Sequence, residues 1–343
     1  MKIVLKQVLG IDVDQKYLVV SMGRLLNTLR TEVFAQNKFV NDSKGFSELV
    51  RWVGSLADPQ IEVLYVMEAT GVYHEKLAYY LDQNNHAVSV VLPNKICNYF
   101  RTLDVKTIND KTSSEAIALF GLGRTLDRWK RPNPGFKKLR QLCRERDQVI
   151  SETTLIKNQL HAEQAEVEPN PSSLSRMKKR LLLLSKQKRE IQEEITAFVK
   201  QDDAIKGRID RLRTIPGVGL ITAVTVLAET NGFELIRNKK QLTSYAGLDV
   251  RDKQSGTSVR SKPSISKRGN RYLRKGLYMP ALTAIRSEGK FKVIFTRLVS
   301  KHGIKMKGLV AIQRKLLELM FVIDKNRSFY QADYQSIPVH TAA

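Results

Sequence analysis

The chain has 343 residues, of which 42% are hydrophobic, and it carries 58 Lys plus Arg against 34 Asp plus Glu. This length predicts two or three domains, and the apolar content is sufficient for packed cores, which excludes a disordered polymer. No apolar run reaches the ~18 residues of a membrane span, and the N-terminus, MKIVLKQVLGIDVD, lacks a signal-peptide cleavage pattern. With Cys97 and Cys143 as the only cysteines, neither a disulfide framework nor a thiolate metal site is expected, and we expect a cytoplasmic protein.

The positive charge is concentrated in the second part of the chain. Residues 1–130 hold 16 basic and 14 acidic side chains, whereas the remaining 213 residues hold 42 basic and 20 acidic ones. A folded domain this basic usually binds a polyanion, most commonly nucleic acid. An anionic membrane is the weaker alternative, because no basic amphipathic helix with an aromatic face stands out.

The first 130 residues alternate between predicted strands and helices. In chain order these are strands at 6–14, 17–23 and 32–41, a helix over 43–56 capped by Ser43, a strand at 63–67, a helix over 73–83, a strand at 86–93 and helical segments through residue 124. Three leading strands followed by helix, strand, helix, strand and helix are the element order of a ribonuclease H-like α/β domain.

Three carboxylates fall at significant places in this order. Asp12 lies in the middle of the first strand, between Ile11 and Val13, and Glu68 ends the fourth strand, which this topology sets beside the first at the sheet centre. Asp110, in INDKTSSEAIALFG, can supply a third acid from the late helix. Carboxylates around one point repel each other unless they share divalent cations, so we predict a Mg²⁺ or Mn²⁺ site suited to phosphodiester chemistry. The alternative for each acid is a solvated strand end or helix cap.

A linker, KRPNPGF, precedes two long predicted helices. The first covers 136–164, and the second would extend roughly 40 Å. Apolar residues in the second helix are spaced alternately three and four apart, with one polar insert: Leu174, Met177, Leu181, Leu184, Lys188, Ile191, Ile195 and Phe198. This coiled-coil seam predicts either an intramolecular antiparallel hairpin or a dimerisation arm over 131–205.

The C-terminal part, 206–343, is predicted to be mostly helical and basic. Within it, LRTIPGVGLITAVTVLAE resembles a helix-hairpin-helix element, in which Gly217 and Gly219 permit a tight turn and free N–H groups could hold a phosphate. Plain helix packing is the alternative. Residues 237–275 contain 12 Lys plus Arg, and a solvated basic face is less plausible than nucleic-acid contact at this density. The candidate contacts are Arg251, Lys253, Arg260, Lys262, Lys267, Arg268, Arg271 and Arg274.

Several of these segments resemble one family, the DEDD transposases of insertion-sequence family one-ten, which are bridge-RNA recombinases. GIDVDQKYLVV and MEATGVYH resemble the first two acidic motifs of the family, and SYAGLDVRDKQSGTSVRS and ISKRGNRYLRKGLY resemble its second, transposase-type domain. The resemblance covers nearly the whole chain. It implies a RuvC-like catalytic domain, transposition of DNA by strand exchange, a structured guide RNA as partner, and a homo-oligomer, either a dimer or a tetramer.

The third acidic motif departs from the family pattern. Counting back from Gly121, the match is Asp110-Lys111-Thr112-Ser113, so Ser113 occupies the position of the last acid. A serine hydroxyl ligates a metal more weakly than a carboxylate, and Glu115 or Asp104 could compensate.

The resemblance also implies a serine nucleophile in the second domain. Ser255, before Gly256 in a predicted turn and flanked by Arg251, Lys253 and Arg260, is the first candidate, and Ser244, in a predicted helix, is the second. A turn serine without chemistry is the alternative. Two other classes of function stay open: a metal-dependent branched-DNA (Holliday-junction) nuclease, which needs the acids but no serine, and a non-catalytic nucleic-acid scaffold.

Overall fold

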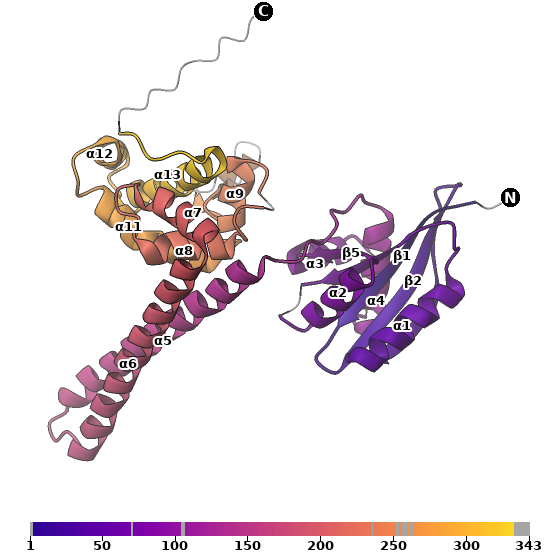
Figure 1. Ribbon diagram of the computed structural model, residues 1–343, viewed down its shortest axis with the longest axis horizontal. Helices are drawn as coiled ribbons and strands as arrows, with labels where there is room; N and C mark the ends of the chain where they lie inside the picture. The colour runs from indigo at the N-terminus through magenta and orange to yellow at the C-terminus, as the bar shows by residue number, and fades with distance from the viewer. Residues whose placement is uncertain are drawn as a thin grey trace, which may run out of the picture. The chain divides into compact units, whose positions relative to one another are not determined.

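The computed structural model describes residues 3–69, 71–103, 107–234, 236–251, 254–255, 259–260 and 264–332, with the backbone alone for 254, 255, 259 and 260. The chain divides into two compact units, Met1–Arg131 and Pro132–Ala343, each of which is described by itself (Figure 1). No helix within the described ranges combines the length and the apolar character needed to cross a membrane.

The first unit is built on a five-stranded mixed sheet with the order β3-β2-β1-β4-β5. Its strands are β1 (Val4–Val13), β2 (Tyr17–Leu26), β3 (Thr31–Val40), β4 (Val63–Glu68) and β5 (Ala87–Val91). The first three strands pair antiparallel, and β4 and β5 run parallel to β1. This order and these orientations fit the predicted ribonuclease H-like α/β domain, with β1 and β4 adjacent at the centre.

Helices cover both faces of this sheet. They are α1 (Ser43–Leu56), α2 (His74–Gln83), α3 (Pro93–Phe100) and α4 (Asp110–Leu122). On one face, Leu9 and Ile11 of β1 pack with apolar residues of α1 and α2. On the other face, Val8 of β1 and Val66 of β4 pack with residues of α3 and α4. The alternation of side chains along β1 therefore assigns even-numbered residues to the α4 face.

The predicted cap of α1 was wrong by one residue. Asp42, not Ser43, is the N-cap: its backbone is extended and its side chain accepts a hydrogen bond from the Gly45 N–H at 2.8 Å. Ser43 is already helical, and its carbonyl accepts the Ser47 hydroxyl. Both Asp and Ser favour N-cap positions, so the sequence alone could not separate two such neighbours.

The second unit begins with two long helices, α5 (Pro134–Gln164) and α6 (Pro171–Gln201), which lie side by side (Figure 1). Leu184, Ile191 and Ile195 of α6 are buried in the core that also holds Leu139 and Ile156 of α5. The polar insert of the predicted seam, Lys188, is exposed. At 31 residues α6 is about 45 Å long. Within one chain the two helices thus form a hairpin, which is one of the two predicted arrangements.

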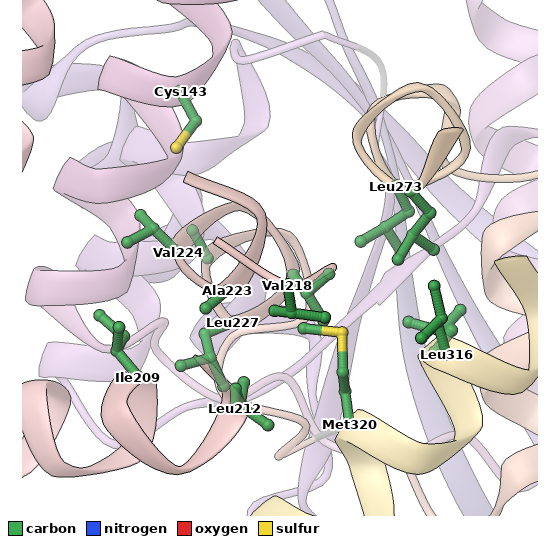
Figure 2. Packing of buried hydrophobic residues seen from close by; sticks show 14 of the residues in the cluster. Cys143, Ile209, Leu212, Val218, Ala223, Val224, Leu227, Leu273, Leu316 and Met320 are labelled. Atoms are coloured by element: carbon green, nitrogen blue, oxygen red, sulfur yellow. The ribbon is translucent and has the colours of Figure 1, made fainter. Parts of the chain in front are cut away.

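Shorter helices complete the second unit. They are α7 (Asp203–Arg213), α8 (Leu220–Glu229), α9 (Lys239–Ala246), α10 (Arg271–Gly276), α11 (Tyr278–Ala284), α12 (Lys290–His302) and α13 (Lys305–Asn326). Figure 2 shows Leu212 of α7, Leu227 of α8 and Met320 of α13 in a common apolar core, to which α5 contributes Cys143 and α10 contributes Leu273. The helices α9 and α10 of the basic segment (residues 237–275) thus pack on this core.

Four two-residue strands follow α9. They are β6 (Val250–Arg251), β7 (Gln254–Ser255), β8 (Val259–Arg260) and β9 (Ser264–Ile265). β6 pairs with β9 and β7 pairs with β8, both antiparallel. They are nested hairpins that the sequence pattern did not predict.

Candidate functional site

Asp12 and Glu68 lie at the carboxyl ends of two neighbouring parallel strands. The pairing of β1 with β4 ends at Ile11 and Met67, one residue before each acid. Asp12 is the penultimate residue of β1, and therefore nearer the strand end than its predicted mid-strand position. Both acids share the α4 face and line one cavity of about 770 Å³. The predicted convergence of these two acids is present in the structure.

The N-terminus of α4 contributes to the same cavity. Asn109 caps the helix, accepting from the Thr112 N–H at 2.9 Å, while its own N–H donates to the Thr112 hydroxyl. Asp110 is the first helical residue and is exposed, whereas Ser113, one turn later, lines the cavity. Glu115 is half-buried, and Asp104 lies outside the described residues.

Close contact between α4 and β1 fixes this helix over the sheet. A Cβ on Gly10 would lie 2.2 Å from the Ser114 carbonyl oxygen and 2.3 Å from the Ala118 nitrogen. The buried hydroxyls of Ser114 and Ser21 are 2.7 Å apart, and Gln36 donates to Ser21. These polar contacts, which the sequence analysis missed, join α4 to β2 and β3.

The acids influence one another electrostatically. Burial raises the pKa of Asp12 to about 6, and the charges of Asp110 and Glu68 act in the same direction, opposed by a hydrogen bond from the Val13 backbone. No three Asp, Glu, His or Cys side chains within the described ranges form a group that could hold a metal ion. The pair Asp12 and Glu68, with all-oxygen donors, is nevertheless chemically suited to a hard divalent cation.

A basic residue, Arg101, also lines the cavity that holds Asp12 and Glu68. It directly follows α3, and Asn94 from the start of that helix lines the cavity as well. An arginine beside two acids offers donors for phosphate oxygens. The sequence analysis missed it, because a single Arg in a nearly neutral domain gives no compositional signal.

The predicted nucleophile, Ser255, is the last residue of β7, where its backbone pairs with Val259 of β8. The structure therefore has it in a short hairpin strand next to 256–258 rather than in the turn. The side chains of Ser255 and Arg260 are not described, and Lys253, Gly256 and Lys262 lie outside the described residues. The second candidate, Ser244, is in α9, as predicted, and is exposed.

The remaining basic candidates differ in their surroundings. Arg251, Lys267, Arg268 and Arg271 are exposed. Arg274 is half-buried and donates to the Ala246 carbonyl oxygen at 2.7 Å, so its guanidinium also closes the end of α9. Four side chains of the predicted set are thus available to a polyanion, while Arg274 has a structural contact.

Gly217 and Gly219 have different environments. Gly217 has φ +84°, and a Cβ there would meet the Pro280 carbonyl oxygen of α11 at 2.5 Å. Gly219 is the exposed N-cap of α8, with open space around its Cβ position. Gly217 thus lets the turn before α8 pack closely against α11. Of these two glycines, only Gly219 has the open surface expected of a phosphate contact.

An ion pair between Arg144 and the buried Glu229 side chain contacts the basic segment through Asn270. The Glu229 side chain is 1% exposed and accepts two hydrogen bonds from Arg144 of α5, at 2.7 and 2.8 Å. It also accepts from Asn270 at 2.6 Å, and Asn270 caps α10 by accepting from the Tyr272 N–H. The Tyr245 hydroxyl donates to the Glu229 carbonyl oxygen. The Glu229 carboxylate therefore joins α5 and α10 to α8, and its backbone carbonyl adds α9, connections with no local sequence signal.

Two family models match the chain. Residues 9–166 match a DEDD transposase model of the IS110 type, described as "Transposase", and residues 209–295 match the model "Transposase IS116/IS110/IS902 family". The first match contains Asp12, Glu68 and Asp110, and the second contains Ser255.

Similar proteins were also found individually. The "Pilin gene-inverting protein" of Moraxella bovis is 30% identical over 295 residues, covering 85% of this chain and 89% of the relative. The "Transposase for insertion sequence element IS1111A" of Coxiella burnetii is 27% identical over 144 residues, covering 41% of this chain and 38% of the relative. Among solved structures, RuvC of T. thermophilus in complex with a Holliday junction substrate is 9% identical, with a TM-score of 0.27, covering 36% of this chain and 99% of that one.

Proposed function

This chain belongs to the IS116/IS110/IS902 family of transposases, and from that membership we propose that it cuts and rejoins DNA with a set of cation-binding groups and one serine. The activity class, DNA transposition or recombination, follows from the family. The proposed groups are Asp12, Glu68, Asp110 and Ser113 for the cation and Ser255 for the nucleophile. The observation that carries the proposal is the shared cavity of Asp12, Glu68 and Ser113 at adjacent strand ends and the start of α4.

Membership of a DEDD transposase family implies dependence on a divalent cation, and we take magnesium, or manganese in its place, as the ion. When bound, it would offset the charge on the oxygens of a phosphodiester. Asp12 and Glu68 would hold it most directly, because both line the cavity. Ser113 would supply a hydroxyl, and Asp110 would act from the exposed start of α4.

The Ser255 hydroxyl would attack phosphorus. A bond forms between Oγ and phosphorus while the bond from phosphorus to one sugar oxygen breaks, and the net transfer takes the hydroxyl proton to the departing oxygen. Rejoining reverses these steps with a new strand end. A covalent intermediate retains the energy of the phosphodiester, which strand exchange needs and simple hydrolysis discards.

The three predicted domains would have different roles in the reaction. Residues 1–130 would carry the acids, 131–205 a dimerisation arm, and 206–343 the nucleic-acid contacts and the serine. The excess of basic side chains after residue 130 supports DNA as the polyanion. A structured guide RNA and a dimer or tetramer are proposed from the family resemblance alone.

Two sets of variants test the proposal. Asp12→Ala and Glu68→Ala should abolish cleavage of a branched DNA in magnesium while leaving DNA affinity nearly unchanged. A nicked substrate should trap a phosphoserine adduct that maps to Ser255 by mass spectrometry and disappears in Ser255→Ala. Free ends without an adduct would indicate a nuclease, and intact DNA a scaffold. An adduct that persists in Ser255→Ala would move the assignment to Ser244.

Inversion of a DNA segment is a second candidate outcome of the same chemistry. It is favoured by one observation, the 30% identity over 85% of the chain to a relative named as a pilin gene-inverting protein. A plasmid that carries the element's two ends distinguishes the outcomes. Inversion reverses the intervening segment and retains it in the plasmid, whereas transposition transfers it to a second plasmid.

A further inference from the structure

A second cavity in the first unit belongs to none of the motifs above. It has a volume of about 560 Å³, and its lining includes Lys95, Asn98, Tyr99, Thr102, Arg124 and Thr125. Two cations, one amide and two threonine hydroxyls thus surround a space beside the aromatic side chains of Tyr99 and Phe120. The chemistry of this lining is opposite in charge to that of the cavity holding Asp12 and Glu68.

Arg124 is held in place at this cavity. Its guanidinium carbon lies 4.3 Å from the ring centroid of Phe120 and 4.7 Å from that of Tyr99, and the two rings contact each other edge to face at 5.4 Å. Its backbone carbonyl accepts from Lys6 Nζ at 2.6 Å, as does that of Gly121. Because cation–π contact uses the face of the guanidinium, the N–H groups around its edge stay available to an acceptor.

The two cations of the cavity lack acidic partners within the described ranges. There, Arg128 pairs with Glu62 and Arg131 with Asp82, but no ion pair involves Lys95 or Arg124. Both residues are exposed to solvent. Unmatched cations with neighbouring amide and hydroxyl groups are the usual partners of nucleic-acid phosphates.

Helix α3 separates this cavity from the one that holds the acids. Residues spaced three and four apart on one stripe of the helix and just beyond it line the acidic cavity: Asn94, Cys97 and Arg101. The next stripe lines the cationic cavity: Lys95, Asn98 and Thr102. A helix is about 10–12 Å across, and the two stripes are adjacent, so a stacked strand covers the distance between the cavities in no more than roughly three nucleotides at 3.4 Å each.

We propose that the cationic cavity binds a phosphate of the DNA strand that is cut, within about three nucleotides of the phosphate at Asp12 and Glu68. Lys95 and Arg124 hold the phosphate oxygens, and Tyr99 forms an apolar wall for the adjacent sugar or base. Only the position of the cut phosphate rests on the proposed function. The phosphate site itself rests on the charges and geometry of this cavity.

The test measures how the affinity of the full chain for single-stranded DNA depends on salt, with EDTA present so that no strand is cut. Each phosphate contact contributes about 0.7 to the logarithmic slope on single strands. Lys95→Ala with Arg124→Ala removes both cations from this one phosphate and should therefore lower the slope by about 0.7, and Lys95→Ala alone should lower it by no more than that. Arg124→Lys, which keeps the charge, should keep the slope.

Lys44→Ala with Arg51→Ala is the matched control, because both side chains are exposed on α1, which covers the opposite face of the sheet. This control should leave the slope unchanged. An unchanged slope in Lys95→Ala and in the double variant overturns the proposal. A reduction with RNA of the same sequence but none with DNA overturns the assignment to DNA. Because nothing is cut in EDTA, failure here is independent of whether Asp12 and Glu68 catalyse cleavage.

Discussion

At the scale of single residues, Gly10 determines how closely α4 approaches the sheet. A Cβ there would lie within 2.3 Å of backbone atoms of Ser114 and Ala118, and backbone cannot move aside as a flexible side chain can. Gly10→Ala must therefore push α4 away from β1. We expect a loss of about 1–3 kcal/mol in the free energy of unfolding, together with reduced DNA cleavage because Ser113 moves with the helix. Thermal or urea denaturation and a cleavage assay measure the two effects.

Gly54 provides the control for this substitution. It lies in the exposed part of α1, where an added Cβ would meet nothing within 4 Å. Gly54→Ala should be neutral or stabilise the protein by about 0.5–1 kcal/mol, since Ala favours the helix. Equal stability of the Gly10→Ala and wild-type proteins would show that α4 adapts without strain.

At the scale of elements, the Glu229 carboxylate joins three helices of the second unit, α5, α8 and α10. Glu229→Ala would leave Arg144 and Asn270 without their acceptor, and the cap of α10 would lose its support. Because Arg144 is 42% exposed, water can replace part of the lost interaction, and we expect destabilisation of about 1–3 kcal/mol. Glu229→Gln should recover part of it, since its amide oxygen still accepts one hydrogen bond. Denaturant unfolding measures all three proteins.

A surface ion pair is the appropriate comparison for Glu229. Arg189 and Glu193 on α6 are 71% and 68% exposed, so Glu193→Ala should cost less than about 1 kcal/mol. A similarly small effect of Glu229→Ala would mean that the buried carboxylate does not hold the basic segment together.

The sequence predicted the strands of the sheet but not the contacts between residues far apart in the chain. The five strands of the sheet were predicted because buried apolar runs and alternation are local signals in the sequence. The predicted strand order in turn placed Asp12 close to Glu68. The pair Arg144–Glu229 spans 85 positions and leaves no periodic trace. The cations at 95 and 124 were missed for a related reason: only folding brings them to one cavity, in a domain whose net charge is close to zero.

At the scale of the whole molecule, the charge asymmetry predicts where affinity for nucleic acid resides. Arg268 and Arg271 are exposed beside the start of α10, whereas the Arg274 guanidinium already bonds the Ala246 carbonyl oxygen. Arg268→Ala with Arg271→Ala should therefore reduce binding without unfolding the unit. On duplex DNA each lost phosphate contact lowers the logarithmic salt slope by about 0.9, so we expect a reduction of about 1.8. Fluorescence anisotropy at several salt concentrations measures it.

Lys178→Ala with Lys179→Ala is the control for this experiment, because both lysines are exposed on α6 and the same number of charges is removed. If net charge alone drew the DNA, the two double variants would lower the slope equally. If the segment that contains α10 is the contact surface, only the arginine variant will lower it, since counterions are released where phosphates are neutralised. A reduction in the lysine variant alone would move the duplex-binding surface to the α5–α6 hairpin.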